Sequence, residues 1–326
     1  MNEPETRPGT EAASEPAPAT GVDAPPGSGA GPAGTPGRPG PLATVLGVLD
    51  VEEIDTDLFR GRSLPQPGGR VFGGQVLAQS LVAAGRTVDG VRLPHSVHGY
   101  FLRAGDASRD ITFTVERLRD GRSFSARRVH ALQRGEPILT LTSSFQVDQP
   151  GLEHTDSPPS RTPPPESVPS ALDLLAPVDH PVATFWTQTA AFDLRHVDEP
   201  LYLGPAREAT SRQMVWMRAR GRVPDGAASQ VLHRALLAYA CDQVMLEPLL
   251  RRHGRSWATP GLSIASLDHA MWFHRPARVD EWLLYVQYAP SASGGRGLGS
   301  ARVYRADGTL VASIAQEGMI RVPDVD

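Results

Sequence analysis

An aspartate inside a strongly apolar stretch is the first feature of this sequence that could do chemistry. Residues 231–246 are hydrophobic almost all the way round a helical wheel, which is typical of a buried helix, and Asp242 is the one carboxylate among them. In a helix, its neighbours one turn away would all be apolar: Ala238, Tyr239, Met245 and Leu246. A charge in such surroundings is costly unless it is paired. The acid therefore indicates either a functional site or a structural ion pair with an arginine.

The other reactive residue types exclude several kinds of chemistry. Cys241 is the single cysteine, and in an apolar helix a thiol ordinarily packs as a small hydrophobe. The sequence has no lysine, which excludes a lysine Schiff base, and no Gly-x-Ser-x-Gly elbow of a serine esterase. Four histidines have a spacing that matches no standard zinc pattern: His95, His98, His269 and His274. We therefore predict neither a metal nor a cofactor.

The beginning of the chain differs in composition from the rest. Residues 1–42 consist mostly of small, polar and proline residues, which bury too little surface to offset the entropy of ordering, so we expect a disordered tail. This segment lacks the pattern of a secretory signal, and no run of 18 apolar residues predicts a transmembrane helix. The net charge of −4 argues against nucleic acid as the main partner. The single cysteine fits a reducing compartment, and we expect a cytoplasmic protein.

The elements that must position Asp242 form two similar series. The first has a helix over 75–84 that follows Gly73-Gly74, and the second has the apolar helix over 231–246. Stretches with strand-like patterns follow each helix: 95–102, 110–119, 123–133 and 137–147 in the first series, and 263–273, 282–289, 298–304 and 309–320 in the second. A short helix is expected within 43–64, and a strand over 215–218 opens the second series.

The repeated order indicates a tandem duplication. Residues 135–142 and 308–315 are similar, and each segment begins with a glycine. An apolar helix followed by an antiparallel meander buries its core only if the sheet wraps the helix. We therefore predict an α+β double hotdog fold, with one hotdog over 43–148, a proline-rich linker over 149–181 in a semi-extended state, and a second hotdog over 182–326.

Several long motifs, in order, resemble the acyl-CoA thioesterase II family of TesB-type double hotdog proteins. The resemblance covers residues 43–322, and six segments carry it: 70–79, 95–106, 119–128, 237–242, 264–276 and 311–318. It implies hydrolysis of acyl-CoA to free fatty acid and CoA by an Asp, a hydroxyl residue and a Gln in the second hotdog. Position by position, these are Asp242, Ser266 and Gln316. The family usually has threonine where this chain has Ser266.

The resemblance also implies how these residues would act. Asp242 would take a proton from a water that Ser266 and Gln316 orient, with no metal and no covalent intermediate. Backbone N–H groups near Gly73 and Gly74, or at the second helix, would stabilise the oxyanion. Asp268 and His269 would support the site from behind, in the strand next to Ser266.

Alternative interpretations stay open at this point. An enoyl-thioester hydratase of hotdog fold would need Asp242 to face a histidine rather than Ser266 and Gln316, and a non-catalytic module would bind acyl-CoA without releasing thiol. Gln316 falls on an apolar strand face, where a lone glutamine is ordinarily a hydrogen-bonded core amide. Arg122, Arg127 and Arg128 are expected on a solvated face. The resemblance further implies a homo-oligomer.

Overall fold

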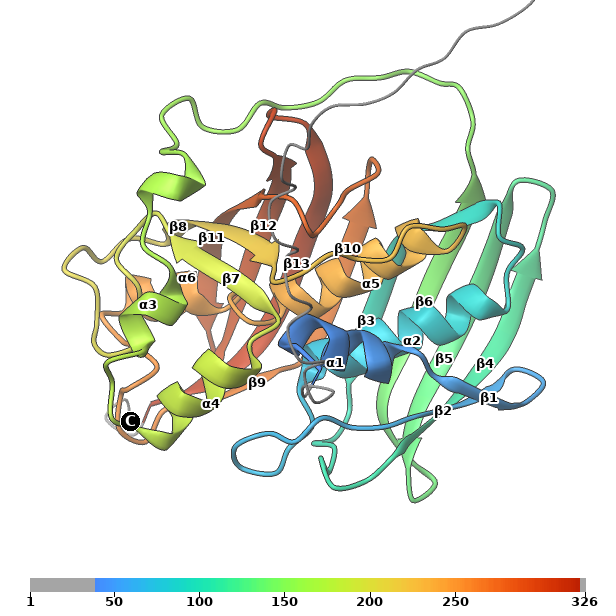
Figure 1. Ribbon diagram of the computed structural model, residues 1–326, viewed down its shortest axis with the longest axis horizontal. Helices are drawn as coiled ribbons and strands as arrows, with labels where there is room; N and C mark the ends of the chain where they lie inside the picture. Colours follow the sequence, from blue (N-terminus) through green and yellow to red (C-terminus); the bar gives the residue numbers. More distant parts are fainter. Residues whose placement is uncertain (1–38, 323–326) are drawn as a thin grey trace, which may run out of the picture. The chain divides into compact units, whose positions relative to one another are not determined.

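One antiparallel sheet of thirteen strands organises residues 39–322, the part of the chain that this computed structural model describes (Figure 1). The tail expected over 1–42 lies outside the described residues up to Arg38, but its predicted end is too late, because Pro41 and Leu42 already belong to a helix and Leu42 is buried. The strands are β1 (Glu52–Asp55), β2 (Leu58–Gly61), β3 (Arg92–Phe101), β4 (Ile111–Asp120), β5 (Phe124–Gln133), β6 (Glu136–Val147), β7 (Phe192–His196), β8 (Arg212–Ala219), β9 (Ser263–Ser266), β10 (Asp268–Phe273), β11 (Leu283–Ser293), β12 (Arg296–Arg305) and β13 (Leu310–Arg321).

The strand order joins two meanders edge to edge. It runs β1-β2-β4-β5-β6-β3-β10-β13-β12-β11-β8-β7, and β9 pairs with β13 beside this path. The two halves meet where β3 pairs with β10, with Ala270 opposite His98. The last three strands of each half, β4-β5-β6 and β11-β12-β13, form the predicted meander. The strands that come before them, β3 and β10, instead pair with the last strand of their own half and with each other.

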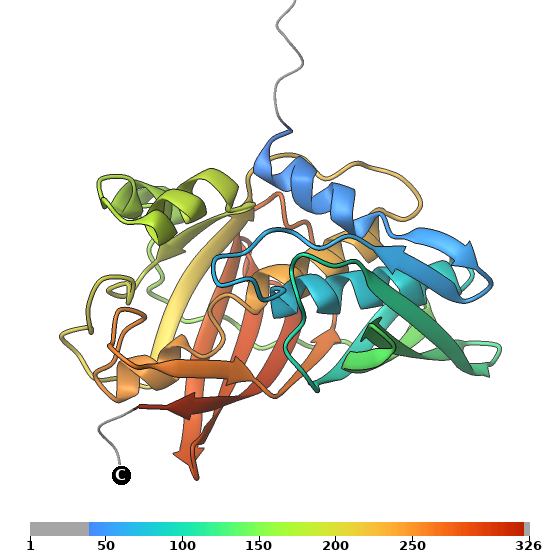
Figure 2. The same cartoon turned by 90° about the horizontal axis from the view of Figure 1, so that it is seen from below.

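Two helices lie side by side against one face of this sheet (Figures 1 and 2). They are α2 (Gly73–Arg86) and α5 (Ser229–Cys241), and α1 (Pro41–Leu49) packs on α2. Gly74 permits the close approach of α2 and α5, because a Cβ there would lie 2.6 Å from the Tyr239 carbonyl oxygen. Helices wrapped by a curved antiparallel sheet are the predicted α+β double hotdog fold.

The apolar helix around Asp242 is shorter than the sequence predicted. α5 ends at Cys241, Asp242 is its C-cap, and turns follow until α6 (Glu247–Arg252), which has Pro248 in its first turn. Val244 and Met245 are each 1% exposed although they are outside the helix. The apolar sequence pattern continues past Cys241 because these turn residues are also buried, and for this reason the pattern predicted a longer helix. Asp242 itself is only partly buried.

Three further expectations need correction. The run 263–273 is two strands, β9 and β10, separated at Leu267, so Ser266 and His269 lie on different strands. The proline-rich segment is not uniformly extended, because it contains a 3₁₀ turn (Pro165–Ser167) and α3 (Ala171–Leu175). The second half opens with α4 (Pro181–Thr189) and β7 before the predicted strand, which is longer than expected.

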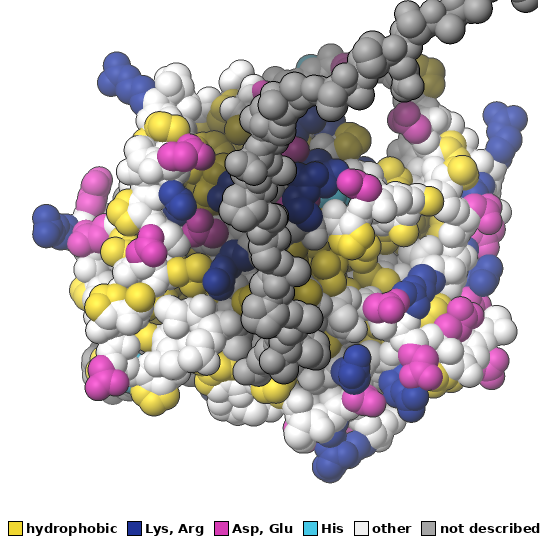
Figure 3. All heavy atoms as spheres, in the orientation of Figure 1, with side chains coloured by type: hydrophobic (Ala, Val, Ile, Leu, Met, Phe, Trp, Pro, Cys, Tyr) yellow, Lys and Arg dark blue, Asp and Glu magenta, His cyan; other side chains and the backbone are white. Residues whose placement is uncertain are grey.

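The surface carries both signs of charge. On the face in Figure 3, arginines and acidic side chains are interspersed around the rim, in keeping with the small net charge of −4. Among residues 39–322, no helix has the length and hydropathy needed to cross a membrane.

Candidate active site

Four elements from both halves converge on Asp242. The C-terminal end of α5 supplies Asp242 itself, and the first turn of α2 supplies Gly74. Ser266 ends β9, and Gln316 lies on β13, two residues before the Gly318 that pairs with Ser266. The three residues that the resemblance singled out are 24 and 50 positions apart in sequence, and the structure brings them together.

The Asp242 carboxylate is held at both oxygens. Oδ1 accepts from the Gln316 amide nitrogen at 2.9 Å and lies 3.4 Å from the Ser266 hydroxyl. Oδ2 accepts from the Gly74 backbone N–H at 2.7 Å. The carboxylate therefore caps the N-terminal end of α2, where the helix dipole favours a negative charge. Because each carboxylate oxygen can accept two hydrogen bonds, acceptor capacity remains for a water.

The structural alternative for Asp242 does not hold. Its partners within residues 39–322 are Gly74, Ser266 and Gln316, and no arginine is among them. Gln316 is 1% exposed and donates to both Asp242 and Ser266, the latter at 2.7 Å. It is thus a hydrogen-bonded core amide, as its strand position suggested, but its donors converge on the carboxylate.

His269 lies behind Gln316 and does not face Asp242. Its Nδ1 is 2.8 Å from Gln316 Oε1, and its Nε2 is 3.3 Å from the Cys241 sulfur. Burial lowers the pKa of His269 below its ordinary value, although the Asp242 charge and the Gln316 bond oppose this shift. The Asp–His pair that the hydratase interpretation requires is therefore not formed.

Asp268 supports the strands rather than the carboxylate. Its Oδ1 accepts from the backbone N–H of Glu317 at 2.8 Å, which ties β10 to β13 next to Gln316. Sequence reasoning named Asp268 and His269 as supporting residues but missed Cys241 as the partner of His269. Cys241 is fully buried, as expected, and its position directly before Asp242 was the available signal.

Gly73 and Gly74, at the start of α2, have contacts other than those expected of oxyanion donors. The Gly74 N–H is committed to Asp242, so it is not a free oxyanion donor. A Cβ on Gly73 would lie 2.9 Å from Asp242 Oδ2 and 3.0 Å from the Phe101 ring. Both glycines therefore serve close packing against the site, one through its N–H and the other through its missing side chain.

The histidines considered as metal ligands do not form a common site. His95 and His274 bind the hydroxyls of Ser144 and Ser313, and His98 packs edge-on against the Trp272 ring. Residues 39–322 contain no cluster of three or more His, Cys, Asp or Glu side chains arranged to hold a metal. Arg127 was expected on a solvated face but is 1% exposed.

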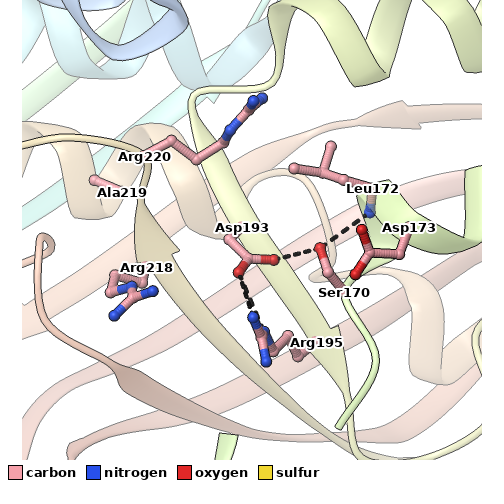
Figure 4. A pocket seen from close by; sticks show the side chains of 8 residues that line it. All are labelled: Ser170, Leu172, Asp173, Asp193, Arg195, Arg218, Ala219 and Arg220. Carbon is pink, nitrogen blue, oxygen red and sulfur yellow. Dashed lines mark hydrogen bonds and ion pairs between the residues drawn. The ribbon is translucent and has the colours of Figure 1, made fainter. Parts of the chain in front are cut away.

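A cavity of about 250 Å³ lies elsewhere, between α3 and the strands β7 and β8 (Figure 4). Asp193 and Arg195 project into it from β7, and Ser170 donates to Asp193 at 2.6 Å while capping α3. None of the predicted site residues lines this cavity. Its polar groups anchor α3 to the sheet edge.

Two family models match the chain. The acyl-CoA thioesterase N-terminal domain matches residues 62–146, and the acyl-CoA thioesterase C-terminal domain matches residues 159–320. The second match contains Asp242, Ser266 and Gln316.

Comparisons with individual proteins indicate the same family. Human acyl-coenzyme A thioesterase 8 is 40% identical over 91% of this chain and 94% of its own length, and acyl-CoA thioesterase 2 of Haemophilus influenzae is 34% identical over 86% and 98%. The crystal structure of an acyl-CoA thioesterase II, TesB2, from Mycobacterium marinum is 42% identical, covers 86% of this chain and 99% of its own, and superposes with a TM-score of 0.71. The chain belongs to the acyl-CoA thioesterase II (TesB-type) family, whose activity is the hydrolysis of acyl-CoA thioesters.

Proposed function

We propose that this enzyme hydrolyses acyl-CoA to a free fatty acid and CoA through a water that Asp242 activates and that Ser266 and Gln316 hold in place. The observation that carries the proposal is the convergence of Ser266 and Gln316 on one carboxylate oxygen, with the other oxygen fixed by Gly74. A carboxylate held from both sides cannot rotate away from a bound water, which lowers the entropic part of the barrier.

The reaction balances with these groups alone. The water oxygen bonds to the thioester carbonyl carbon while Asp242 takes one water proton as general base. The tetrahedral intermediate then collapses, and the carbon–sulfur bond breaks. The leaving CoA sulfur takes up the proton that Asp242 holds, which restores the carboxylate. Because thiols are good leaving groups, with pKa values of about 8.5, no strong acid is required for this step.

Ser266 departs from the threonine usual in the family, and the hydroxyl is preserved. It accepts from Gln316 at 2.7 Å, so its own hydrogen is directed to Asp242 or to the water. Serine lacks the methyl group that restricts rotation about χ1 in threonine. We therefore expect a working but less rigid hydroxyl.

A thiol-release assay across acyl-CoA chain lengths tests the proposal with wild type, Gln316→Ala and Asp242→Asn. We expect both variants to keep the wild-type melting temperature within a few degrees and to lose most turnover at every chain length. Unchanged rates in both variants would exclude this catalytic set, and acyl-CoA binding without any thiol release in the wild type would favour a binding module instead.

We also propose that the enzyme is a cytoplasmic homo-oligomer. Two large side chains support assembly: Tyr100 on β3 and Trp272 on β10 are 61% and 40% exposed on neighbouring strands. Sedimentation velocity at several protein concentrations measures the oligomeric state, and a single monomer at all concentrations would contradict the assembly. Fractionation of source cells tests the location.

A further inference from the structure

A buried chain of polar groups runs behind the catalytic carboxylate. It leads from the Cys241 thiol to the His269 ring, at 3.3 Å, and from the ring to the Gln316 side chain, at 2.8 Å. Cys241 is fully buried, and His269 and Gln316 are each 1% exposed. Water does not reach these atoms, so each donor and acceptor in the chain must be satisfied by its neighbours.

The direction of every hydrogen bond in this chain follows from Asp242. A carboxylate only accepts, so the Gln316 atom 2.9 Å from Oδ1 must be the amide nitrogen. The amide oxygen then faces His269 Nδ1, which must carry the hydrogen. A neutral imidazole has one N–H, so Nε2 accepts, and the group facing it is the Cys241 thiol, which can donate.

The protonation states that this direction requires are favoured by burial. Burial raises the pKa of the Cys241 thiol well above its ordinary value, and the neighbouring Asp242 charge adds to the shift. Burial also lowers the pKa of His269. The thiol also has the Ala238 carbonyl at 3.2 Å as an acceptor. If it turned to that carbonyl alone, His269 Nε2 would be left buried without a donor, which is unfavourable.

We propose that His269, with Cys241 behind it, is a positioning residue that fixes the side-chain amide of Gln316 so that both amide hydrogens point at Asp242 and Ser266. The inference rests on the proposed function, because it matters only if Gln316 helps to hold the water. Without His269, the glutamine keeps its attraction to Asp242 but loses the bond at its oxygen. Its amide then samples rotations in which one hydrogen leaves Ser266.

Kinetics of the full-length protein with His269→Ala, Gln316→Ala and the double variant test this role. We expect His269→Ala to lower kcat about tenfold with little change in KM, since the residue acts on turnover and not on acyl-CoA binding. In the Gln316→Ala background, His269→Ala should lower kcat almost no further, because the glutamine amide through which His269 acts is already absent. A residue that merely supports the fold would lower kcat by the same factor in both backgrounds.

Conservative variants provide the second measurement. His269→Asn offers an amide N–H near the position of Nδ1 and should recover most of the activity that His269→Ala loses. Cys241→Ser keeps a donor and should resemble wild type, whereas Cys241→Ala should lower kcat about two- to fivefold for one lost hydrogen bond.

The outcomes separate this inference from the proposed function. Equal losses in both Gln316 backgrounds, or no recovery by His269→Asn, would overturn the positioning role. If His269→Ala does not fold, the Cys241→Ala and Cys241→Ser pair decides, and equal kcat values in the two would overturn it. If Asp242→Asn is fully active, the proposed function fails instead, whatever the His269 variants do.

Discussion

The two halves of the molecule place different residues at equivalent positions, and the three residues proposed to hold and activate a water all belong to the second half. Each helix ends in a polar cap, which is Thr87 after α2 and Asp242 after α5. Gly135 and Gly308, both with positive φ, lie in the turns just before the last strand of each half, β6 and β13. Eight residues beyond them lie Ser143 and Gln316. The first half thus has a hydroxyl where the second has a carboxylate, and a serine where the second has the glutamine.

The strand next to this position also differs. Arg127 is opposite Ser143 on β5, and Gly299 is opposite Gln316 on β12. Arg127 donates from Nε to the Thr87 hydroxyl at 2.8 Å and from another nitrogen to the Thr87 carbonyl at 3.0 Å. In the first half, a buried arginine therefore fills the place beside the helix cap and satisfies its polar groups.

In the second half, the lack of a side chain at Gly299 makes room for the backbone that follows α5. A Cβ on Gly299 would lie 2.1 Å from the Met245 carbonyl oxygen, which a real atom cannot do. The segment 242–246 therefore passes directly over β12, and its first residue is Asp242, the proposed general base. At this one strand position, the first half has a buried arginine that satisfies its helix cap, and the half that carries the proposed catalytic residues has a glycine.

The largest effect should come from the two helix caps. We expect Asp242→Asn to lower kcat about a thousandfold, because the general base is lost while the shape is kept. Thr87→Val, the matched change in the first half, should leave kcat near wild type and lower the free energy of unfolding. Steady-state thiol release measures kcat, and denaturant unfolding measures stability. A similar loss of turnover in Asp242→Asn and Thr87→Val would show that the two helix caps do not differ in their importance for catalysis.

The next effect should come from Gly299. Gly299→Ala must displace the Met245 carbonyl and with it the turn that carries Asp242, so we expect kcat to fall about tenfold or more and stability to drop by about 1–3 kcal/mol. Gly204→Ala is the control, since a Cβ there has no atom within 4 Å. Equal behaviour of the two alanine variants would contradict the role given to Gly299.

Arg127 should matter for stability and not for turnover. Arg127→Met leaves the Thr87 and Arg119 carbonyls without their donor, so we expect a loss of about 1–3 kcal/mol in the free energy of unfolding. The kcat per folded molecule should remain that of wild type. A specific loss of kcat in a fully folded Arg127→Met enzyme would mean that the first half takes part in catalysis.

Acid should weaken the fold through its buried histidines. Burial lowers the pKa of His269 below its ordinary value of 6.5. Between the lowered value and 6.5 the unfolded chain binds more protons than the folded protein, so the free energy of unfolding rises with pH there and declines as the pH drops below 6.5. His269→Asn should show a shallower decline between pH 7.5 and pH 5.5 in denaturant titrations. An identical slope would show that His269 does not contribute.

The smallest effect should come from Ser266→Thr. The added methyl restricts χ1 and is worth about 0.8 kcal/mol where it packs, so we expect kcat to stay within about threefold of wild type. Ser266→Ala is the comparison, because it removes the hydroxyl that Gln316 contacts. If the alanine variant matched the threonine variant, the hydroxyl would have no part in turnover.

The sequence predicted the repeated helix-and-strand pattern because alternation and apolar faces follow from local spacing. It also predicted the set of Asp242, Ser266 and Gln316, through the resemblance of whole motifs. It did not predict where α5 ends, since a buried turn is as apolar as a buried helix. The burial of Arg127 and the close approach at Gly299 depend on how strands pair, and no local pattern contains that information.

In the proposed reaction, water attacks the thioester carbon directly and Asp242 takes only a proton from that water. A single turnover in heavy-oxygen water, with enzyme in excess over acyl-CoA, tests this most directly by mass spectrometry of both products and protein. We expect one heavy oxygen in the released fatty acid and none in the peptide that contains Asp242. Heavy oxygen in that peptide, with ordinary oxygen in the first fatty acid released, would contradict it.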